Sequence, residues 1–314
     1  RQRIESFGGK FLFATKLTDI NIKNGKIESV VLNNQEVVPC SGLVLALGHS
    51  ARDTFYMLNE KGLVMKNKPF AVGLRIMHPQ NLIDENQYGF LDSKLPAASY
   101  KLTFKTSNNK GVYSFCMCPG GYVVNASSET NRLCINGMSY AQRDSGIANS
   151  ALIVTVNETD YGTTLFAGVE FQRKLEAKAY QLGKGLIPME TYGDYKDNKN
   201  PKSLGKLEPK IKGQYHLANL NELLPHNLNI ALKEGIENFD RKIKGFASNE
   251  ALLCGIESRS SSPLRITRNE YYESNISGIY PCGEGAGYAG GITSAAIDGL
   301  KVSEAIMNKF KPLR

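Results

Sequence analysis

The sequence predicts a mixed α/β fold in which a β-rich domain is inserted into an open α/β domain. A continuous apolar run bounded by glycines at residues 42–48 is typical of a buried parallel strand, and a β-like run at 279–292 breaks into five glycines before an apolar helix. From Pro69 the chain between these two segments changes to alternating short strands and turns. We therefore expect residues 1–64 and 257–314 to form the α/β domain, and residues 65–256 the insert.

The N-terminal part reads as a small β-meander followed by one strand and one helix. Short β-rich runs predict strands at residues 11–14, 17–22 and 27–32. Asn24-Gly25 is a strong signal for a hairpin turn. After the buried strand at 42–48, the pattern predicts a helix at 51–58 with Ser50 as its N-cap.

The middle section is expected to hold strands at 70–76, 113–115, 122–126, 133–136 and 151–156, and helices at 170–182 and 219–240. Pro225 should break or restart the second helix, because proline lacks a backbone N–H. Residues 193–213 are predicted to be a disordered loop. Short strands after residue 257 lead into the glycine-rich turn and the terminal helix.

Composition bounds the class of protein. The 314 residues suggest two domains, and 41% hydrophobic with 22% charged residues is ordinary for a soluble globular protein. The apolar runs are far shorter than the ~20 residues that span a bilayer, and we expect no secretory leader. We expect a cytoplasmic protein with reduced thiols and no metal site, because its six cysteines are scattered and form no C-x-x-C pair. The chain begins with Arg1, so we expect a fragment of a longer protein.

The formal charge of +8 does not by itself indicate a nucleic-acid partner. Much of the excess lies in a lysine-rich stretch interleaved with Asn, Gly and Pro, namely Lys196, Lys199, Lys202, Lys206, Lys210 and Lys212. A nucleic-acid footprint normally gathers on one face together with aromatic or groove-entering elements. The stretch is better explained as a solvated loop, and no nucleic-acid or membrane partner is expected.

The strand, glycine-rich turn and helix at 279–292 form anion-binding architecture. Glycine lets the backbone approach a ligand closely, and the first turn of a helix offers unpaired N–H groups. Gly285, Gly287 and Gly290 formally satisfy G-x-G-x-x-G, but no second strand with an acidic residue follows the helix, so this is a closing element. Gly48 and Gly283 would both lie at strand ends, where ligands bind; tight packing without a ligand is the alternative.

Other candidate side chains each have a structural alternative. Glu284 could accept a hydrogen bond from a ribose or ribityl hydroxyl, or be an ordinary exposed carboxylate. Cys116 and Cys118 lie two apart on one strand face, where a disulfide would be strained, so buried or pocket-lining thiols are favoured over a redox pair. The polar clusters around Arg75 and His78, Arg143, and Arg259 with Arg265 could clamp a carboxylate or phosphate, or form salt bridges. The four histidines, His49, His78, His216 and His226, assemble no triad or metal set.

At these residues the chain resembles the uncharacterised bacterial FAD-dependent dehydrogenases, members of the two-dinucleotide-binding-domain flavoprotein class. The resemblance covers nearly the whole chain and rests on Leu45–Thr54, Lys68–Arg75, Phe115–Gly121, Ser262–Arg265 and Tyr280–Ile292. It implies a Rossmann-like FAD/NAD(P)-binding domain whose N-terminal strand and glycine-rich phosphate cradle are missing here. Leu47 replaces the usual Thr of the Ala-Thr-Gly signature, and Met77 stands where Glu is expected before His78.

What the resemblance implies about function is an FAD-dependent oxidoreductase that passes hydride between flavin and an unknown small substrate, with NAD(P)H as a candidate electron donor. The implied cofactor contacts are Ala46, Gly48, His49, Gly283, Glu284, Gly285, Gly287, Gly290, Gly291 and Ile292. The candidate substrate-site residues are Arg75, His78, Cys116, Cys118, Arg143 and Arg259. Without the cradle, this fragment is expected to hold FAD poorly and to be inactive alone.

Two other functions stay open at this point: a flavin-dependent RNA-modifying factor and a non-catalytic binding module. The sequence names neither the substrate, nor the electron acceptor, nor a catalytic acid or base, nor the oligomeric state.

Overall fold

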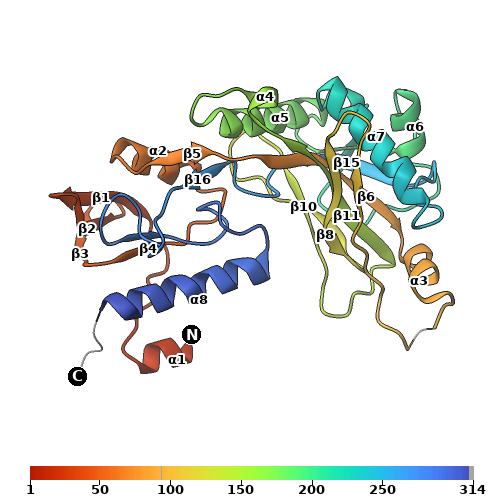
Figure 1. The fold of residues 1–314 in the computed structure, drawn as a ribbon. Helices are drawn as coiled ribbons and strands as arrows, with labels where there is room; N and C mark the ends of the chain where they lie inside the picture. Colours follow the sequence, from red (N-terminus) through yellow and green to blue (C-terminus); the bar gives the residue numbers. More distant parts are fainter. Residues whose placement is uncertain (93, 311–314) are drawn as a thin grey trace. The chain divides into compact units, whose positions relative to one another are not determined.

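The computed structural model describes residues 1–92 and 94–310, and residues 311–314 of the predicted segment 257–314 lie outside them. The chain divides into two units, which are coloured along the sequence in Figure 1. Unit 1 comprises Arg1–Lys68 with Leu264–Arg314, and unit 2 comprises Pro69–Pro263. Both units contain strands and helices, so the chain has the mixed α/β composition that the sequence predicts.

Unit 1 is built from short elements. In chain order they are α1 (Gln2–Ser6), β1 (Leu17–Lys23), β2 (Lys26–Leu32), β3 (Glu36–Pro39), β4 (Leu43–Leu45), α2 (Arg52–Glu60), β5 (Met65–Asn67), β16 (Leu264–Ile266), β17 (Ile279–Pro281) and α8 (Ile292–Lys309). They form an antiparallel meander β1-β2-β3, an antiparallel pair β16-β5 and a parallel pair β17-β4.

The meander follows from its turn chemistry. Asn24 and Gly25 both have positive φ, 52° and 74°, which is the conformation that a tight hairpin turn requires at its two central residues. The prediction of a strand at residues 11–14 is wrong: the backbone there is irregular and Ala14 has φ 52°. A β-rich run becomes a strand only when a neighbouring strand completes its hydrogen bonds, and among the described residues none pairs with this one.

The predicted buried strand at 42–48 is shorter and less covered than expected. β4 contains three residues and pairs in parallel with β17, so that Val44 lies beside Tyr280. Leu45 is buried, but Val44 on the opposite face is 45% exposed, because no described element of unit 1 covers that face. The helix that follows begins at Arg52 with Ala51 at the N-cap position, so Ser50 is not the cap.

The terminal helix, α8, is labelled in Figure 1, and its Val302 packs against Tyr280 of β17 and against Cys282. Only Asp298 and Val302 are buried among its described side chains. Large apolar side chains of the same helix are exposed: Ile292, Ile297, Leu300 and Met307.

Unit 2 is organised around a seven-stranded mixed sheet of order β14-β12-β15-β6-β11-β8-β7. Its strands are β6 (Phe70–Pro79), β7 (Thr103–Lys105), β8 (Gly111–Cys118), β11 (Ile147–Val156), β12 (Ile187–Thr191), β14 (Tyr215–Leu217) and β15 (Leu252–Glu257). A smaller sheet holds β9 (Tyr122–Asn125), β10 (Ile135–Met138) and β13 (Ile211–Lys212). The helices are α3 (Gln80–Tyr88), α4 (Glu158–Tyr161), α5 (Ala167–Leu182), α6 (Tyr192–Asp197) and α7 (His226–Asp240), with a 3₁₀ turn η1 (Leu220–Glu222).

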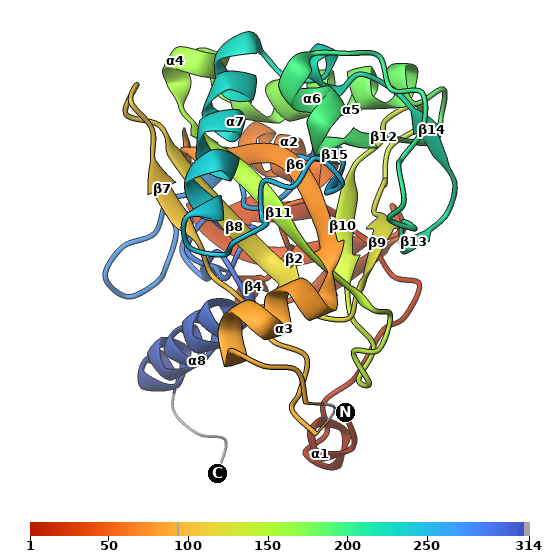
Figure 2. The same cartoon turned by 90° about the vertical axis from the view of Figure 1, so that its right-hand side faces the viewer.

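The apolar periodicity correctly predicted the two long helices of this unit. α5 packs against β12 and β15 of the large sheet, and α7 packs against β7, β8 and β11; both helices are labelled in Figure 2. Pro225 separates η1 from α7, as its missing N–H predicts. The prediction of a disordered loop at 193–213 is wrong, because that segment carries most of α6, anchored by buried Tyr195, and β13, which extends the small sheet.

Among the described residues, no helix combines the length and apolar character needed to cross a bilayer.

Candidate functional site

Two glycine turns meet at the carboxyl ends of β4 and β17. Gly48 and Gly283 each leave their strand in the left-handed region, with φ of 70° and 75°, a conformation that glycine adopts at no steric cost. A Cβ on Gly285 would lie 2.4 Å from the carbonyl oxygen of Gly48, and one on Gly287 would lie 2.5 Å from that of Leu264. Close backbone packing therefore requires glycine at both positions.

Gly290 and Gly291, unlike Gly285 and Gly287, have no close backbone neighbours. A Cβ on Gly290 would meet no atom within 4 Å, and one on Gly291 would meet only Ser294 Oγ, at 4.0 Å. No packing in the free protein explains glycine at these positions. They stand immediately before α8, where Ile292 is 93% exposed. The first N–H groups of a helix have no partner within the helix, and here Ser294 Oγ accepts from the Gly291 N–H at 3.1 Å. Space, unpaired donors and the positive end of the helix dipole coincide here, which favours a negatively charged or polar ligand.

His49 and Glu284 link the two strand ends. His49 Nδ1 lies 2.9 Å from Glu284 Oε1, and both side chains are partly buried. Glu284 is thus oriented by a partner rather than freely solvated. His49 Nε2 is buried with no hydrogen-bond partner within the described structure. A buried imidazole nitrogen without a partner costs free energy unless a ligand atom meets it.

Positive charge surrounds this carboxylate. Burial lowers the pKa of Lys68, the nearby Arg265 lowers it further, and Glu284 acts in the opposite direction, so Lys68 is close enough to both side chains to respond to their charges. Arg265 donates to the carbonyl oxygen of Gly287 at 3.2 and 3.3 Å, and its guanidinium lies 5.0 Å from the ring centre of Tyr288.

A buried ion pair that the sequence reasoning missed holds the glycine-rich turn in place. Arg268 donates to both carboxylate oxygens of Asp298 in α8, at 2.6 and 2.9 Å, and to the carbonyl oxygen of Pro281 at 2.8 Å. Asp298 Oδ2 also accepts from the Gly283 N–H at 2.8 Å. The Arg268 guanidinium lies 3.6 Å from the ring centre of Tyr288. The available signal was Asp298, an acid that stands between the apolar residues Ile297 and Leu300 of the terminal helix.

In unit 2, Arg75 and His78 occupy structural positions. Arg75 is fully buried and donates to Glu257 at 3.0 Å and to Asn149 at 2.8 Å, which is the salt-bridge alternative. His78 is 1% exposed, its Nε2 lies 2.8 Å from the carbonyl oxygen of Phe246, and burial lowers its pKa to about 4. Neither side chain is open to a ligand within this unit.

Arg259 and Arg143 lie apart from that pair. Arg259 donates to both oxygens of Glu176, at 3.0 and 2.9 Å, with its side chain 8% exposed. Arg143 lines a cavity of about 480 Å³ together with Gln80, Asp84, Tyr88 and Asp144. None of the other candidate substrate-site residues lines this cavity, so the structure does not gather all six in one place, although it brings Arg75 to Cys116 and Cys118.

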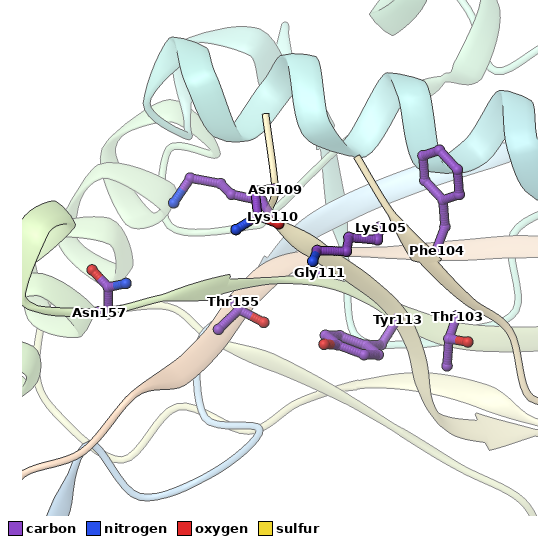
Figure 3. Close-up of a pocket in the computed structure, with 9 residues that line it drawn as sticks. All are labelled: Thr103, Phe104, Lys105, Asn109, Lys110, Gly111, Tyr113, Thr155 and Asn157. Atoms are coloured by element: carbon purple, nitrogen blue, oxygen red, sulfur yellow. The ribbon is translucent and has the colours of Figure 1, made fainter. Parts of the chain in front are cut away.

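A second cavity of unit 2, also about 480 Å³, is drawn in Figure 3. Its walls come from the hairpin of β7 and β8 and from the end of β11, and include Lys105, Tyr113 and Thr155. Lys110 reaches Asp160 with both carboxylate oxygens within 2.9 Å, so its charge is already matched. None of the residues singled out in the sequence lines this cavity. No metal-ligating cluster occurs among residues 1–92 and 94–310.

Known proteins resemble this chain at several levels. Residues 69–260 match the family described as "FAD-dependent protein, C-terminal domain-like". An uncharacterised protein of Clostridium beijerinckii is 50% identical over 317 residues, which cover 99% of this chain but only 59% of that protein. A solved oxidoreductase from Methanosarcina mazei aligns with a TM-score of 0.39 and 14% identity, over 96% of this chain and 52% of the other. On the strength of the first match, the chain belongs to the family of FAD-dependent proteins that share this C-terminal domain.

Proposed function

We propose that the chain is part of an FAD-dependent oxidoreductase and that the strand-end turns of unit 1 contribute to its flavin site. The observation that carries this is the open space at Gly290, where a Cβ would meet no described atom within 4 Å at the very start of α8. It lies next to the exposed first turn of α8, in the same turn region as the His49–Glu284 pair. Family membership independently points to FAD.

The residues present suit such a cofactor. The N–H groups at the start of α8, with Gly290 and Gly291, suit a phosphate or polar ring edge, because backbone can approach closely there. Glu284 would accept a hydrogen bond from a ribityl or ribose hydroxyl, and His49 Nε2 would gain its missing partner. The bound flavin would supply hydride transfer, and the protein would supply position and electrostatics. The Rossmann-like assignment of unit 1 belongs to this proposal.

Gly290→Ala and Gly299→Ala form a matched pair for testing the site. A Cβ at either position meets no protein atom within 4 Å, so neither change should disturb the free fold. If a flavin approaches the start of α8, Gly290→Ala should weaken FAD binding by at least ~10-fold, about 1.4 kcal/mol, whereas Gly299→Ala should not. Quenching of flavin fluorescence in a titration with FAD measures both dissociation constants.

The longer C. beijerinckii relative should be purified and reconstituted with FAD alongside this chain, and both visible spectra recorded. Flavin bands in both proteins, or in the relative alone, would support an FAD protein of which this chain is one part. Absence of flavin from both after reconstitution would contradict the proposal.

We propose an unidentified small molecule as the substrate. The predicted substrate-site residues have weaker support than the flavin site, because they do not line one common cavity. NAD(P)H as electron donor, the RNA-modifying factor and the non-catalytic binding module stay predictions, because no observation on the described residues favours any of them.

A further inference from the structure

Strand β8 does not keep its regular alternation at Cys116. Opposite β11, Asn149 pairs with Cys118 but Ala151 pairs with Phe115, so β8 holds one extra residue at this point. Cys116 itself has φ 43°, in the left-handed region that few non-glycine residues adopt. This is a β-bulge, a feature that redirects side chains and is over-represented beside functional sites.

The bulge changes what the two thiols can do. In a regular strand, residues two apart are separated by about 6.6 Å, near the upper limit for disulfide-bonded Cα atoms, and their side chains run parallel. A bulge bends the strand and removes that constraint. Cys118 Sγ turns back toward residue 116, where its S–H donates to the carbonyl oxygen of Cys116 at 3.4 Å.

The two thiols differ in access. Cys116 is exposed, whereas Cys118 is half-buried and burial raises the pKa of its thiol against the opposing effect of Arg75. Cys134, Cys254 and Cys282 are buried, and Cys40 is half-buried in unit 1. An exposed thiol with a second, sheltered thiol two residues away is the arrangement of an attacking and a resolving cysteine.

The surroundings hold the bulge in place. The buried guanidinium of Arg75 donates to the carbonyl oxygen of Cys116 at 3.3 Å and is itself fixed by Glu257 and Asn149. On the far side, a Cβ on Gly121 would lie 2.8 Å from the Cβ of Cys118, so glycine lets the following turn close over it. The arrangement of these two cysteines is therefore built into the sheet.

We propose that Cys116 and Cys118 form a reversible dithiol–disulfide couple that exchanges with low-molecular-weight disulfides. The Cys116 thiolate attacks one sulfur of the small disulfide, a mixed disulfide forms and one small thiol leaves. The Cys118 thiolate then attacks the Cys116 sulfur, the protein disulfide forms and the second small thiol leaves. The two cysteines lose two electrons and two protons in total, which the two released thiols carry away.

The test uses the full chain with glutathione disulfide as the probe. After incubation, mass spectrometry should show the loss of two hydrogen atoms, located by proteolysis to the peptide that holds both cysteines, and reduced glutathione should reverse it. Cys118→Ser should instead accumulate a stable glutathione adduct at Cys116, and Cys116→Ser should react at least ~10-fold more slowly, as expected for a sheltered thiol. Cys40→Ser is the matched control and should behave as the unaltered chain.

Three results would overturn this assignment: six unchanged thiols, a stable glutathione adduct on the unaltered chain, or disulfides only between chains. Circular dichroism of each variant shows whether it is folded, so that an unreactive variant is not mistaken for an unfolded one. The outcome does not depend on flavin binding, and it stands apart from the proposed function.

Discussion

Arg75 shows how burial decides the role of a single residue. A guanidinium with no exposed surface must be paired, because an unpaired buried charge costs several kcal/mol. Its partners are Glu257 in β15, Asn149 in β11 and the carbonyl oxygen of Cys116 in β8, and Asn136 in β10 also accepts a hydrogen bond, at 3.3 Å. The sequence left a ligand clamp and a salt bridge open, and the complete set of internal partners favours the salt bridge.

Glu190 in β12 is a buried carboxylate that is only partly satisfied. It has no exposed surface, Oε1 accepts from the Leu220 N–H at 2.6 Å, and Oε2 has no hydrogen-bond partner in the described structure. Burial raises the pKa of Glu190 to about 8. The folded protein therefore retains this proton at a pH where the unfolded chain has released it.

This raised pKa predicts that the free energy of unfolding falls as pH rises. Below about pH 4.5 both states carry the proton, and between about 4.5 and 8 only the folded state does, so the stabilisation is lost progressively and the loss is complete above about 8. Glu190→Gln keeps the acceptor for Leu220 and cannot ionise. It should be more stable than the unaltered chain at pH 9 by up to ~5 kcal/mol and nearly equal at pH 4, as measured by urea unfolding.

Glu85→Gln is the control, because this carboxylate is exposed in α3 and is not among the groups that shift the pKa of Glu190. It should follow the unaltered chain at both pH values. Equal pH dependence in the Glu190→Gln variant and the unaltered chain would show that Glu190 is not the group responsible.

At the scale of elements, the glycine-rich turn illustrates two different uses of one residue type. Gly285 and Gly287 permit backbone packing inside the protein, whereas Gly290 leaves open space at the start of α8. The conformation of the turn depends on contacts with α8. The Gly283 N–H donates to Asp298 in the second turn of α8, and Arg268 fixes that carboxylate. Helix and turn are thus one cooperative element.

Arg268→Lys should loosen this element without removing the positive charge. Lysine cannot form the two-pronged contact with Asp298 while also reaching Pro281, so the turn should lose order. We expect unit 1 to lose ~1–3 kcal/mol of stability and hydrogen exchange of the peptide covering 283–291 to accelerate by ~10-fold or more.

The exposed pair Lys16–Asp53 in the same unit provides the comparison, with both side chains more than 60% exposed. Lys16→Ala should change stability by less than ~0.5 kcal/mol and leave exchange of the turn unaltered. If Arg268→Lys left hydrogen exchange of the turn unchanged, its role in ordering the turn would be excluded.

On the scale of the whole molecule, the two units differ in how much core they hold. Unit 2 is one continuous segment, its main hydrophobic cluster runs from Phe70 to Ile256, and its two ends meet where Ser260 Oγ donates to the carbonyl oxygen of Ala71 at 2.6 Å. Unit 1 is assembled from two segments and exposes large apolar side chains on α8, of which Ile292, Leu300 and Met307 are 93%, 66% and 65% exposed.

Residues 69–263 should therefore fold on their own. We expect a dispersed amide NMR spectrum and a single cooperative unfolding transition, because this segment contains its own core. Its free energy of unfolding should be about 5–15 kcal/mol. A molten, dye-binding state would contradict this expectation.

The complementary protein joins residues 1–67 to 264–314 through a short Asp-Gly turn. This is feasible because Asn67 and Leu264 are already paired in the β5–β16 ladder. It should be the less stable of the two proteins and bind hydrophobic dyes, since its apolar side chains remain uncovered.

The sequence by itself determined the features that depend on near neighbours. The Asn24-Gly25 turn, the two long helices of unit 2, the break at Pro225 and the strand, glycine turn and helix of 279–292 follow from backbone preferences and periodicity within a few residues. Errors at 11–14 and 193–213 arose where a distant partner strand or a buried side chain decided the conformation.

Only the tertiary structure decided which polar groups meet. Arg75 and Glu257 are 182 residues apart, and the His49–Glu284 pair joins opposite ends of the chain. The bulge at Cys116 likewise depends on how β8 registers against β11, which strict alternation could not anticipate. The physical reason is that periodicity states which face of a strand is buried, whereas partners across a sheet are set by register and by the packing of elements far apart in sequence.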